Sequence, residues 1–157
     1  MLYIKKSVIF FTIIIISLSL NNFVKAAQDI TTGNLITKYL QFQDNLGKSE
    51  SKTHIKEIKE LFTPEIVCIE DGQIFAKGHK ELEKRLVELK EMYGSWGAVL
   101  QKQTISADGI TATIQYELVT EKAGIFHVVS ILHLSKDQKI STIDESYYRV
   151  DTELEDN

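Results

Sequence analysis

Apolar and polar residues alternate along most of the second half of the chain. Between residues 110 and 118 every even-numbered position is apolar, and the positions between them carry threonine, glutamine or glutamate. A period of two is typical of a β-strand that buries one face and exposes the other. Similar patterns predict four long strands, at 96–105, 110–119, 125–134 and 140–150. Short turns at Asp108-Gly109, 122–124 and 136–139 join them, which indicates an antiparallel meander.

The N-terminal third repeats its apolar residues at helical spacing instead. A first helix, with Thr31 or Thr32 as its N-cap, ends in the polar segment 45–53. Its apolar positions are Leu35, Ile36, Tyr39, Leu40 and Phe42.

A second, shorter helix carries Ile55, Ile58, Leu61 and Phe62 on one face. Pro64 marks its end, because the residue before a proline avoids helical dihedral angles.

A short hairpin and a third helix connect these helices to the long strands. Asp71-Gly72 is a turn dipeptide between two short apolar runs, 66–69 and 73–76. The third helix runs from Gly78 to Gly94. Its apolar stripe consists of Leu82, Leu86, Leu89 and Met92.

These elements predict one α+β domain over residues 27–151. A half-apolar sheet must be covered on one face, and the three N-terminal helices are the elements available to cover it. We therefore expect a curved antiparallel sheet of about four long strands plus a short hairpin, wrapped around three N-terminal helices as a cone. A cone of this kind leaves an apolar cleft at its open end. Residues 152–157 are expected to form an acidic tail.

The N-terminus has the pattern of a signal peptide over residues 1–26. Lys5 and Lys6 precede an apolar run over 8–20, and small residues near Ala26 suit a signal peptidase. The run is shorter than the roughly 20 residues that a membrane-spanning helix needs. We expect an exported, periplasmic or secreted protein with no stable membrane span after cleavage; an uncleaved anchor is the alternative.

Charge argues against nucleic acid as a partner. Removing Lys5, Lys6 and Lys25 leaves 15 of the 18 basic residues against 22 acidic ones, a formal net charge of −7. Binding to phosphate backbones requires clustered Lys and Arg. The single cysteine, Cys68, has no internal disulfide partner and is expected to be a small residue within a strand.

The order helix, helix, hairpin, helix and four strands resembles the NTF2-like superfamily, in particular its SnoaL-like and ketosteroid-isomerase-like branch. Local patterns agree with the resemblance: 61–65 entering the first strand, 78–82 opening the third helix, and 139–140 leading into a strand with Glu145, Tyr147 and Tyr148. The resemblance covers nearly the whole mature chain. It implies a cone-shaped fold, frequent dimers, and functions that range from isomerases and cyclases to binding proteins.

The resemblance to ketosteroid isomerase suggests Asp71 or His127 as a candidate base and Tyr39 as a candidate hydrogen-bond donor. That enzyme uses a carboxylate base with an oxyanion hole made of a tyrosine and a protonated carboxylic acid. Glu70-Asp71 stands where the basic aspartate is expected, and Tyr39 could match the tyrosine. The third member has no clear counterpart, although His127 and His133 fall on the relevant strand.

Each candidate also has a structural interpretation, so none is a firm catalytic residue. Asp71 precedes glycine in a hairpin turn, where aspartate is favoured for its backbone conformation. Tyr39 lies on an apolar helix face, typical of a core residue. His127 and His133 alternate with apolar residues, as packed histidines do. The four histidines are scattered, so no metal site is expected.

We expect an exported binding or accessory module that holds a small apolar ligand or a protein partner at the cone, without a cofactor. The alternative is a cofactor-free isomerase, cyclase or lyase. A homodimer through the sheet is also expected, on the strand face bearing Val99, Ile105 and Val119. The expected ligand-binding residues are Tyr39, Trp96, Tyr116, His127 and Tyr148.

Overall fold

The computed structural model describes residues 30–48 and 55–150. All of the described residues 30–48 belong to the first helix. It is followed by α2 (Ile55–Leu61), β1 (Phe62–Glu70), β2 (Gln73–Lys77), α3 (Gly78–Tyr93), β3 (Trp96–Ile105), β4 (Thr111–Thr120), β5 (Gly124–Leu134) and β6 (Ile140–Val150). The expected signal peptide and acidic tail lie outside the described residues. Within them, no helix is long and apolar enough to cross a membrane.

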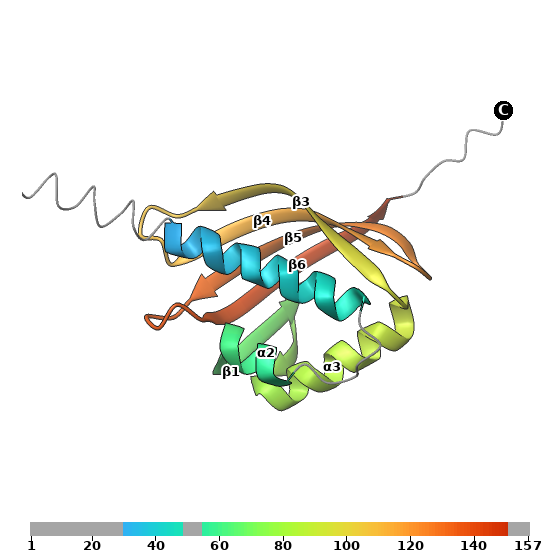
Figure 1. The fold of residues 1–157 in the computed structure, drawn as a ribbon, viewed down its shortest axis with the longest axis horizontal. Coiled ribbons are helices and arrows are strands. Elements are labelled where there is room, and N and C mark those ends of the chain that lie inside the picture. The colour runs from blue at the N-terminus through green and yellow to red at the C-terminus, as the bar shows by residue number, and fades with distance from the viewer. Residues whose placement is uncertain (1–29, 49–54, 151–157) are drawn as a thin grey trace, which may run out of the picture.

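The strands form one curved sheet in the order β2-β1-β6-β5-β4-β3. Figure 1 shows the first helix lying across the concave side of the long strands, with α2 and α3 beside β1 at one end. The α+β class, the curved sheet and the element order are therefore as the sequence predicts. The hairpin adds two strands to the four long ones, and β1 pairs with β6 in parallel, so the sheet is mixed.

The first helix begins before its predicted N-cap, since residue 30 is already helical. Thr32 lies inside it, fully buried, and its hydroxyl donates to the carbonyl of Gly109, so neither threonine is where the N-cap was expected. The polar segment 45–53 was expected to end the helix, and the described residues are helical up to residue 48, within that segment. Leu46 is buried there, and the ammonium of Lys90 donates to the carbonyls of Leu46 and Gly47. A bond from a side-chain cation to the last carbonyls stabilises a helix end.

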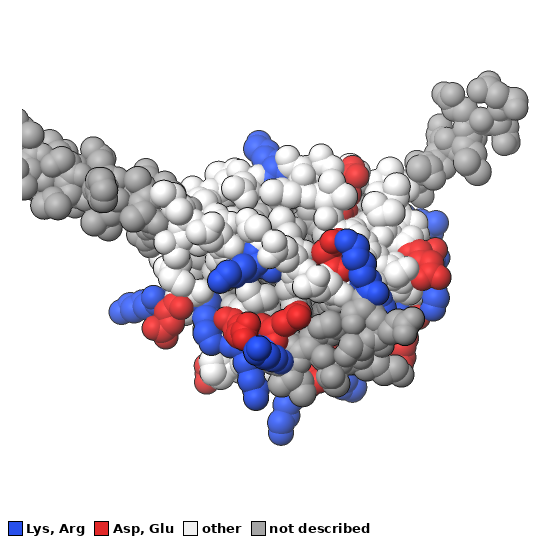
Figure 2. Space-filling model, in the orientation of Figure 1, with Lys and Arg blue, Asp and Glu red and all other residues white. Residues whose placement is uncertain are grey.

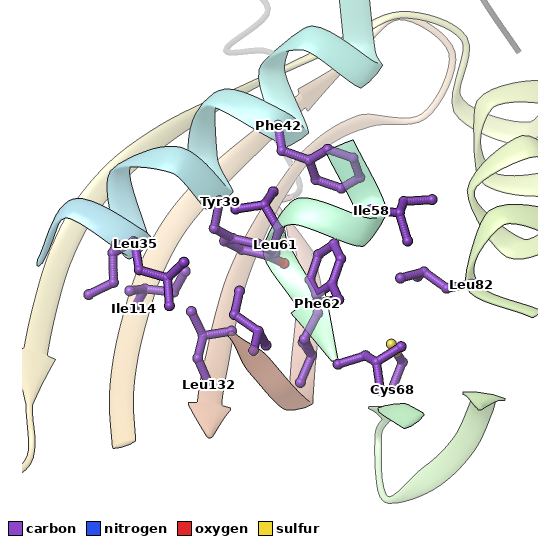
Figure 3. Close-up of a cluster of buried hydrophobic side chains, with 14 of the residues drawn as sticks. Leu35, Tyr39, Phe42, Ile58, Leu61, Phe62, Cys68, Leu82, Ile114 and Leu132 are labelled. Atoms are coloured by element: carbon purple, nitrogen blue, oxygen red, sulfur yellow. The ribbon is translucent and has the colours of Figure 1, made fainter. Parts of the chain in front are cut away.

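Phe62 opens β1 rather than closing α2. Its side chain is 1% exposed, and its ring makes edge contacts with Tyr39 and Phe42 at centroid distances of 6.4 and 5.6 Å. Figure 3 shows these aromatic side chains converging in the core. Pro64 lies within β1, between the two stretches where β1 pairs with β6. Such a position tolerates a residue that has no backbone N–H.

The third helix has the predicted bounds but a shorter buried stripe. Leu82 and Leu86 are buried and Leu89 packs against the core, whereas Met92 is 54% exposed, contrary to expectation. The helix ends at Gly94, whose φ of 72° favours glycine and whose N–H donates to the carbonyl of Lys90. The chain then turns directly into β3.

A bulge in β3 removes Ile105 from the face on which a dimer contact was expected. Val99 and Val119 are exposed on the outer side of the sheet, as expected. Ile105 instead packs against the core and pairs with the buried Ala112. The register between β3 and β4 shifts between Leu100 and Lys102. One extra residue reverses the direction of every side chain beyond it.

Charged side chains avoid one region of the surface. In Figure 2, Lys, Arg, Asp and Glu lie mostly in the lower half of the view, with both signs intermingled. The upper part, over β3, carries few of them. The surface seen in this view therefore lacks the extended basic patch that nucleic-acid binding requires.

Candidate functional site: an acidic cavity in the cone

A cavity opens between α3 and the concave face of the sheet. Its volume is about 90 Å³, counted as the space open to the centres of water molecules. One such molecule needs roughly 10–15 Å³ on this measure, so the cavity can hold a small organic molecule. Its lining is mainly apolar and aromatic: Tyr39, Gln43, Cys68, Glu70, Phe75, Leu82, Leu86, Leu89, Tyr93, Trp96, Tyr116, Leu118, Phe126, Val128, Ile143, Glu145 and Tyr147.

The lining residues differ in how deeply they are buried. Tyr39, Tyr116 and Cys68 are almost completely buried and belong to the inner part of the cavity. Tyr93 and Phe126 are half-buried and lie nearer to solvent. The half-buried rings form a connected group, because Phe126 lies 5.5 Å from Tyr93 and 5.8 Å from Tyr147 between ring centroids. The entrance is therefore aromatic.

The polar centre of the cavity is the carboxyl group of Glu145 on β6. Its Oε1 accepts hydrogen bonds from the hydroxyls of Tyr39 and Tyr116, each at 3.0 Å, and from the hydroxyl of Ser130. The three donors come from the first helix, β4 and β5. Tyr39 in turn accepts a bond of 2.9 Å from the amide of Gln43. The carboxyl group is thus held from three sides through one of its two oxygens.

Burial controls the electrostatics of this group. It raises the pKa of Glu145, the three hydroxyl bonds lower it in part, and the charge of Glu70 raises it further. The pKa values of Tyr39 and Tyr116 lie well above their usual range, mainly because of burial and then because of the charge of Glu145. Both tyrosines consequently keep their protons and act as donors.

Glu70 is a second carboxylate in the lining, held in a different way. Its Oε1 accepts a bond from the hydroxyl of Tyr147, and its Oε2 lies 3.2 Å from Nη2 of Arg85 on α3. Arg85 and Glu70 are both mostly buried, with 23% and 19% of their side chains exposed. The bond to Glu70 is the main reason that the pKa of Tyr147 is raised. Glu70 therefore has a cationic partner within the protein.

The described residues offer no metal-binding cluster. No three histidine, cysteine, aspartate or glutamate side chains among them gather closely enough to hold an ion. The polar groups of the cavity lining include carboxyl, hydroxyl, amide and thiol groups.

Comparison with known proteins identifies the fold but not a sequence family. No family model matches the chain, and no curated protein matches it in sequence. A SnoaL-like family protein from Agrobacterium tumefaciens superposes with a TM-score of 0.61 at 9% identity, covering 76% of this chain and 98% of the other. An NTF2-like protein of unknown function from Exiguobacterium superposes with a TM-score of 0.58 at 18% identity, covering 75% and 99%.

A third similar structure is a hypothetical protein with a ketosteroid isomerase-like fold from Catenulispora acidiphila, in complex with trimethylamine. Its TM-score is 0.56 at 13% identity, over 74% of this chain and 85% of the other. The chain has an NTF2-like fold. At these identities the similarity establishes the fold alone, as expected for a fold that carries many functions.

The NTF2-like cone brings together three of the five expected ligand-binding residues. Tyr39, Trp96 and Tyr116 all line the cavity. Trp96 is anchored by a 3.0 Å bond from its indole N–H to the carbonyl of Gln43, and the ammonium of Lys90 lies 5.1 Å from its ring centroid. These contacts fix the indole beside the end of the first helix.

The other two expected ligand-binding residues, His127 and Tyr148, lie on the outer face of the cone. His127 is adjacent to Tyr148 across the β5–β6 pair, with 5.2 Å between ring centroids. Nε2 of His127 is 3.4 Å from Glu117, and Tyr148 is 62% exposed. In β5 the residues that face inward are Val128, Ser130 and Leu132, so the alternation places His127 outside. The expected position of both residues in the cleft is therefore wrong.

Asp71 occupies the hairpin turn and not the cavity. It is exposed, its φ is 47°, and its N–H donates to the carbonyl of Glu145 at 3.0 Å. Aspartate tolerates this backbone conformation better than most residues do. The structure thus favours the turn interpretation and removes Asp71 as a base within the cavity.

Glu145 and Glu70 line the cavity, although the sequence pattern indicated Glu145 only as part of the last strand and Glu70 only beside the candidate Asp71. Residues of β6 alternate between two polar sets, so the sequence did not reveal which set faces inward. The register settles this, because Glu145 lies opposite the fully buried Ser130. A usable signal existed, since Glu145 alternates with Ile143 and Tyr147, both of which line the cavity.

Proposed function

We propose that this protein is an exported binding module that holds a small organic molecule inside the cone, with Glu145 as the polar anchor. The observation that carries this proposal is a carboxyl group placed deep in an apolar, aromatic-lined cavity. Binding sites for small molecules typically combine such a lining with a few convergent polar groups. The trimethylamine bound to the similar structure from Catenulispora acidiphila gives a precedent for a small ligand on this fold.

The alternative function is cofactor-free proton transfer with Glu145 as the base. The raised pKa of Glu145 favours it, because a general base works best when its pKa lies near the operating pH. The hydrogen bonds argue against it. Tyr39, Tyr116 and Ser130 donate their hydroxyl protons to Glu145, so none of these three protons is directed at a substrate oxygen. A binding role needs no such donor and therefore fits better.

We also propose that two copies pair through the outer face of the sheet. Val99, Val119, Val129 and Ile131 are each more than a third exposed there, together with Tyr148. Val129 and Ile131 lie two residues apart on the same face of β5, and exposed apolar groups that adjoin one another are typical of interaction sites. Analytical ultracentrifugation of the wild type and of Val129→Lys tests this pairing; a wild type that remains monomeric at high concentration contradicts it.

A cavity-filling variant tests the binding function. Val128 faces the cavity and is 5% exposed, whereas its neighbour Val129 points outward and is 37% exposed. We expect small molecules that raise the melting temperature of the wild type to lose this effect in Val128→Phe and to keep it in Val129→Phe. The melting curve of each variant without ligand reports whether it folds. Stabilisation that survives in a folded Val128→Phe variant contradicts binding in this cavity.

Isotope exchange separates binding from catalysis. A base that abstracts protons next to a carbonyl group exchanges those protons with solvent. We expect ketone ligands incubated with the protein in D₂O to keep their C–H signals in NMR spectra. Exchange that the wild type catalyses and Glu145→Gln does not would establish the alternative function instead.

A further inference from the structure

We propose that the ligand of this cavity is a small organic cation, recognised by the Glu145 carboxylate and by the aromatic rings of the entrance. The inference rests on the proposed binding function and names the class of molecule that the cavity selects. Its support comes from three features of the lining: the sign of its charges, the bonding of Glu145, and the arrangement of its rings.

The charged groups of the lining are both acidic. Glu70 and Glu145 are its carboxylates, and the lining contains no lysine, arginine or histidine. Arg85 neutralises Glu70 through its ion pair. No ion pair within the described part of the chain involves Glu145. One negative charge in the cavity therefore lacks a partner of opposite sign.

The hydroxyl bonds leave part of Glu145 available to a ligand. Tyr39, Tyr116 and Ser130 all donate to Oε1, and none of the three donates to Oε2. Glu145 is half-buried although its donors are almost fully buried, which is consistent with a carboxyl group whose remaining surface faces the cavity. A carboxylate removed from water is stabilised most by a paired cation. A cationic ligand supplies that charge, whereas a neutral apolar ligand removes water and supplies none.

The rings at the entrance suit the rest of such a ligand. Cations are attracted to the faces of aromatic rings within about 6 Å of the centroid. The protein already has two contacts of this kind at the edges of the cavity, Lys90 over Trp96 at 5.1 Å and Arg85 over Phe75 at 5.5 Å. In the described residues, no side-chain cation lies over the group formed by Tyr93, Phe126 and Tyr147. That group remains available for an alkylammonium ion.

The same lining disfavours a metal ion. Hard cations such as Ca²⁺ take six to eight oxygen ligands. Both oxygens of Glu70 are engaged by Tyr147 and Arg85, so the lining has one carboxylate left to offer. An organic cation needs fewer oxygens, because its alkyl groups contact the apolar walls.

Choline and its neutral carbon analogue, 3,3-dimethylbutan-1-ol, test the inference. The two molecules have nearly the same shape and differ in charge. In NMR titrations of the wild type we expect choline to bind at least about tenfold more tightly than the alcohol, which corresponds to about 1.4 kcal/mol. We also expect its N-methyl protons to shift upfield because of the aromatic rings. Equal or tighter binding of the alcohol overturns the inference but leaves small-molecule binding intact.

Two carboxylate variants locate the selectivity. Glu145→Gln keeps the size of the side chain and an oxygen that accepts the hydroxyl bonds, so we expect choline to lose its advantage while the alcohol still binds. Asp144→Asn makes the same change of charge on the adjacent residue, which pairs with the exposed Ile131 on the outer face, and should keep the advantage. An equal loss in both variants overturns the inference. If neither probe binds the wild type, the cation assignment fails, and the cavity-filling experiment decides separately whether the cavity binds anything.

Discussion

Glu70 on β1 lies directly opposite Glu145 on β6, in the parallel strand pair that joins the hairpin to the rest of the sheet. Register partners direct their side chains to the same face, and both of these line the cavity. Their surroundings differ, because Glu70 is paired with Arg85 while Glu145 is bonded to hydroxyl groups. Two carboxylates of the same chemistry thus have separate roles, one in holding α3 to the sheet and one in the cavity.

The first prediction concerns pH and Glu145. A carboxyl group whose folded pKa is raised stabilises the protein below its unfolded pKa, about 4.3 for glutamate, and loses this contribution as pH rises through the folded value. Glu145→Gln has no ionisable carboxyl group at this position, so its stability does not fall for this reason as pH rises. We therefore expect the free energy of unfolding of Glu145→Gln, relative to the wild type, to increase as pH rises above about 4.3.

Urea denaturation at a series of pH values measures this difference. The tyrosines and Cys68 around Glu145 have raised pKa values and keep their protons over the range, and Glu70 is present in both proteins. Asp144→Asn is the matched control for loss of one negative charge from the outer face. A relative stability of Glu145→Gln that stays flat or falls with pH contradicts the raised pKa.

The second prediction concerns the hydroxyl of Tyr116. Tyr116→Phe removes one of the three donors to Glu145 without changing the ring. Hydrogen bonds to charged groups contribute about 1.5–3 kcal/mol, so we expect a loss of this size in the free energy of unfolding at neutral pH. Tyr148→Phe removes a hydroxyl that contacts His127 on the outer face and should cost less than about 0.5 kcal/mol. Equal costs would show that Glu145 does not depend on its donors.

The third prediction concerns the thiol of Cys68. The side chain is fully buried in β1, and burial, with a smaller effect from the charge of Glu145, raises its pKa to about 12. Since the thiolate is the reactive form, we expect Ellman's reagent at mildly alkaline pH to label the folded protein at least about 100-fold more slowly than the protein in guanidinium chloride. Comparable rates would show a thiol that is both accessible and activated.

Element order was readable from the sequence because it depends on local patterns. The alternation in 112–118 fixes which side of β4 is buried, and Gly94 fixes where α3 ends. Ile110, predicted on the buried face, instead precedes β4 and is exposed. Inward and outward faces of the other strands depend on pairing between distant residues. The bulge that turns Ile105 inward, and the register that places Glu145 against Ser130, carry no local signal. Tyr39 was found because helical spacing shows its face, whereas His127 was misplaced because β5 carries apolar residues on both of its faces.

The last prediction uses two glycines of the first helix that should respond to alanine in opposite directions. At Gly47 an added Cβ would lie 2.1 Å from the carbonyl oxygen of Trp96 and 2.7 Å from its indole Cδ1. At Gly33 nothing lies within 4 Å of the added atom. Alanine is a better helix former than glycine by about 0.5–1 kcal/mol, so Gly33→Ala should stabilise the protein by that amount.

Gly47→Ala should instead destabilise it by about 1–3 kcal/mol, because overpacking forces the helix end away from β3. The shift would also strain the bond from the Trp96 indole to Gln43 and the bonds from Lys90 to the last helical carbonyls. Urea denaturation measures both effects, and the fluorescence of Trp96, the single tryptophan, reports the local change. Since Trp96 lines the cavity, Gly47→Ala should weaken ligand binding while Gly33→Ala leaves it unchanged. If both variants gain stability, the close approach of the first helix to β3 is wrong, and the position of Trp96 at the cavity must be reassigned with it.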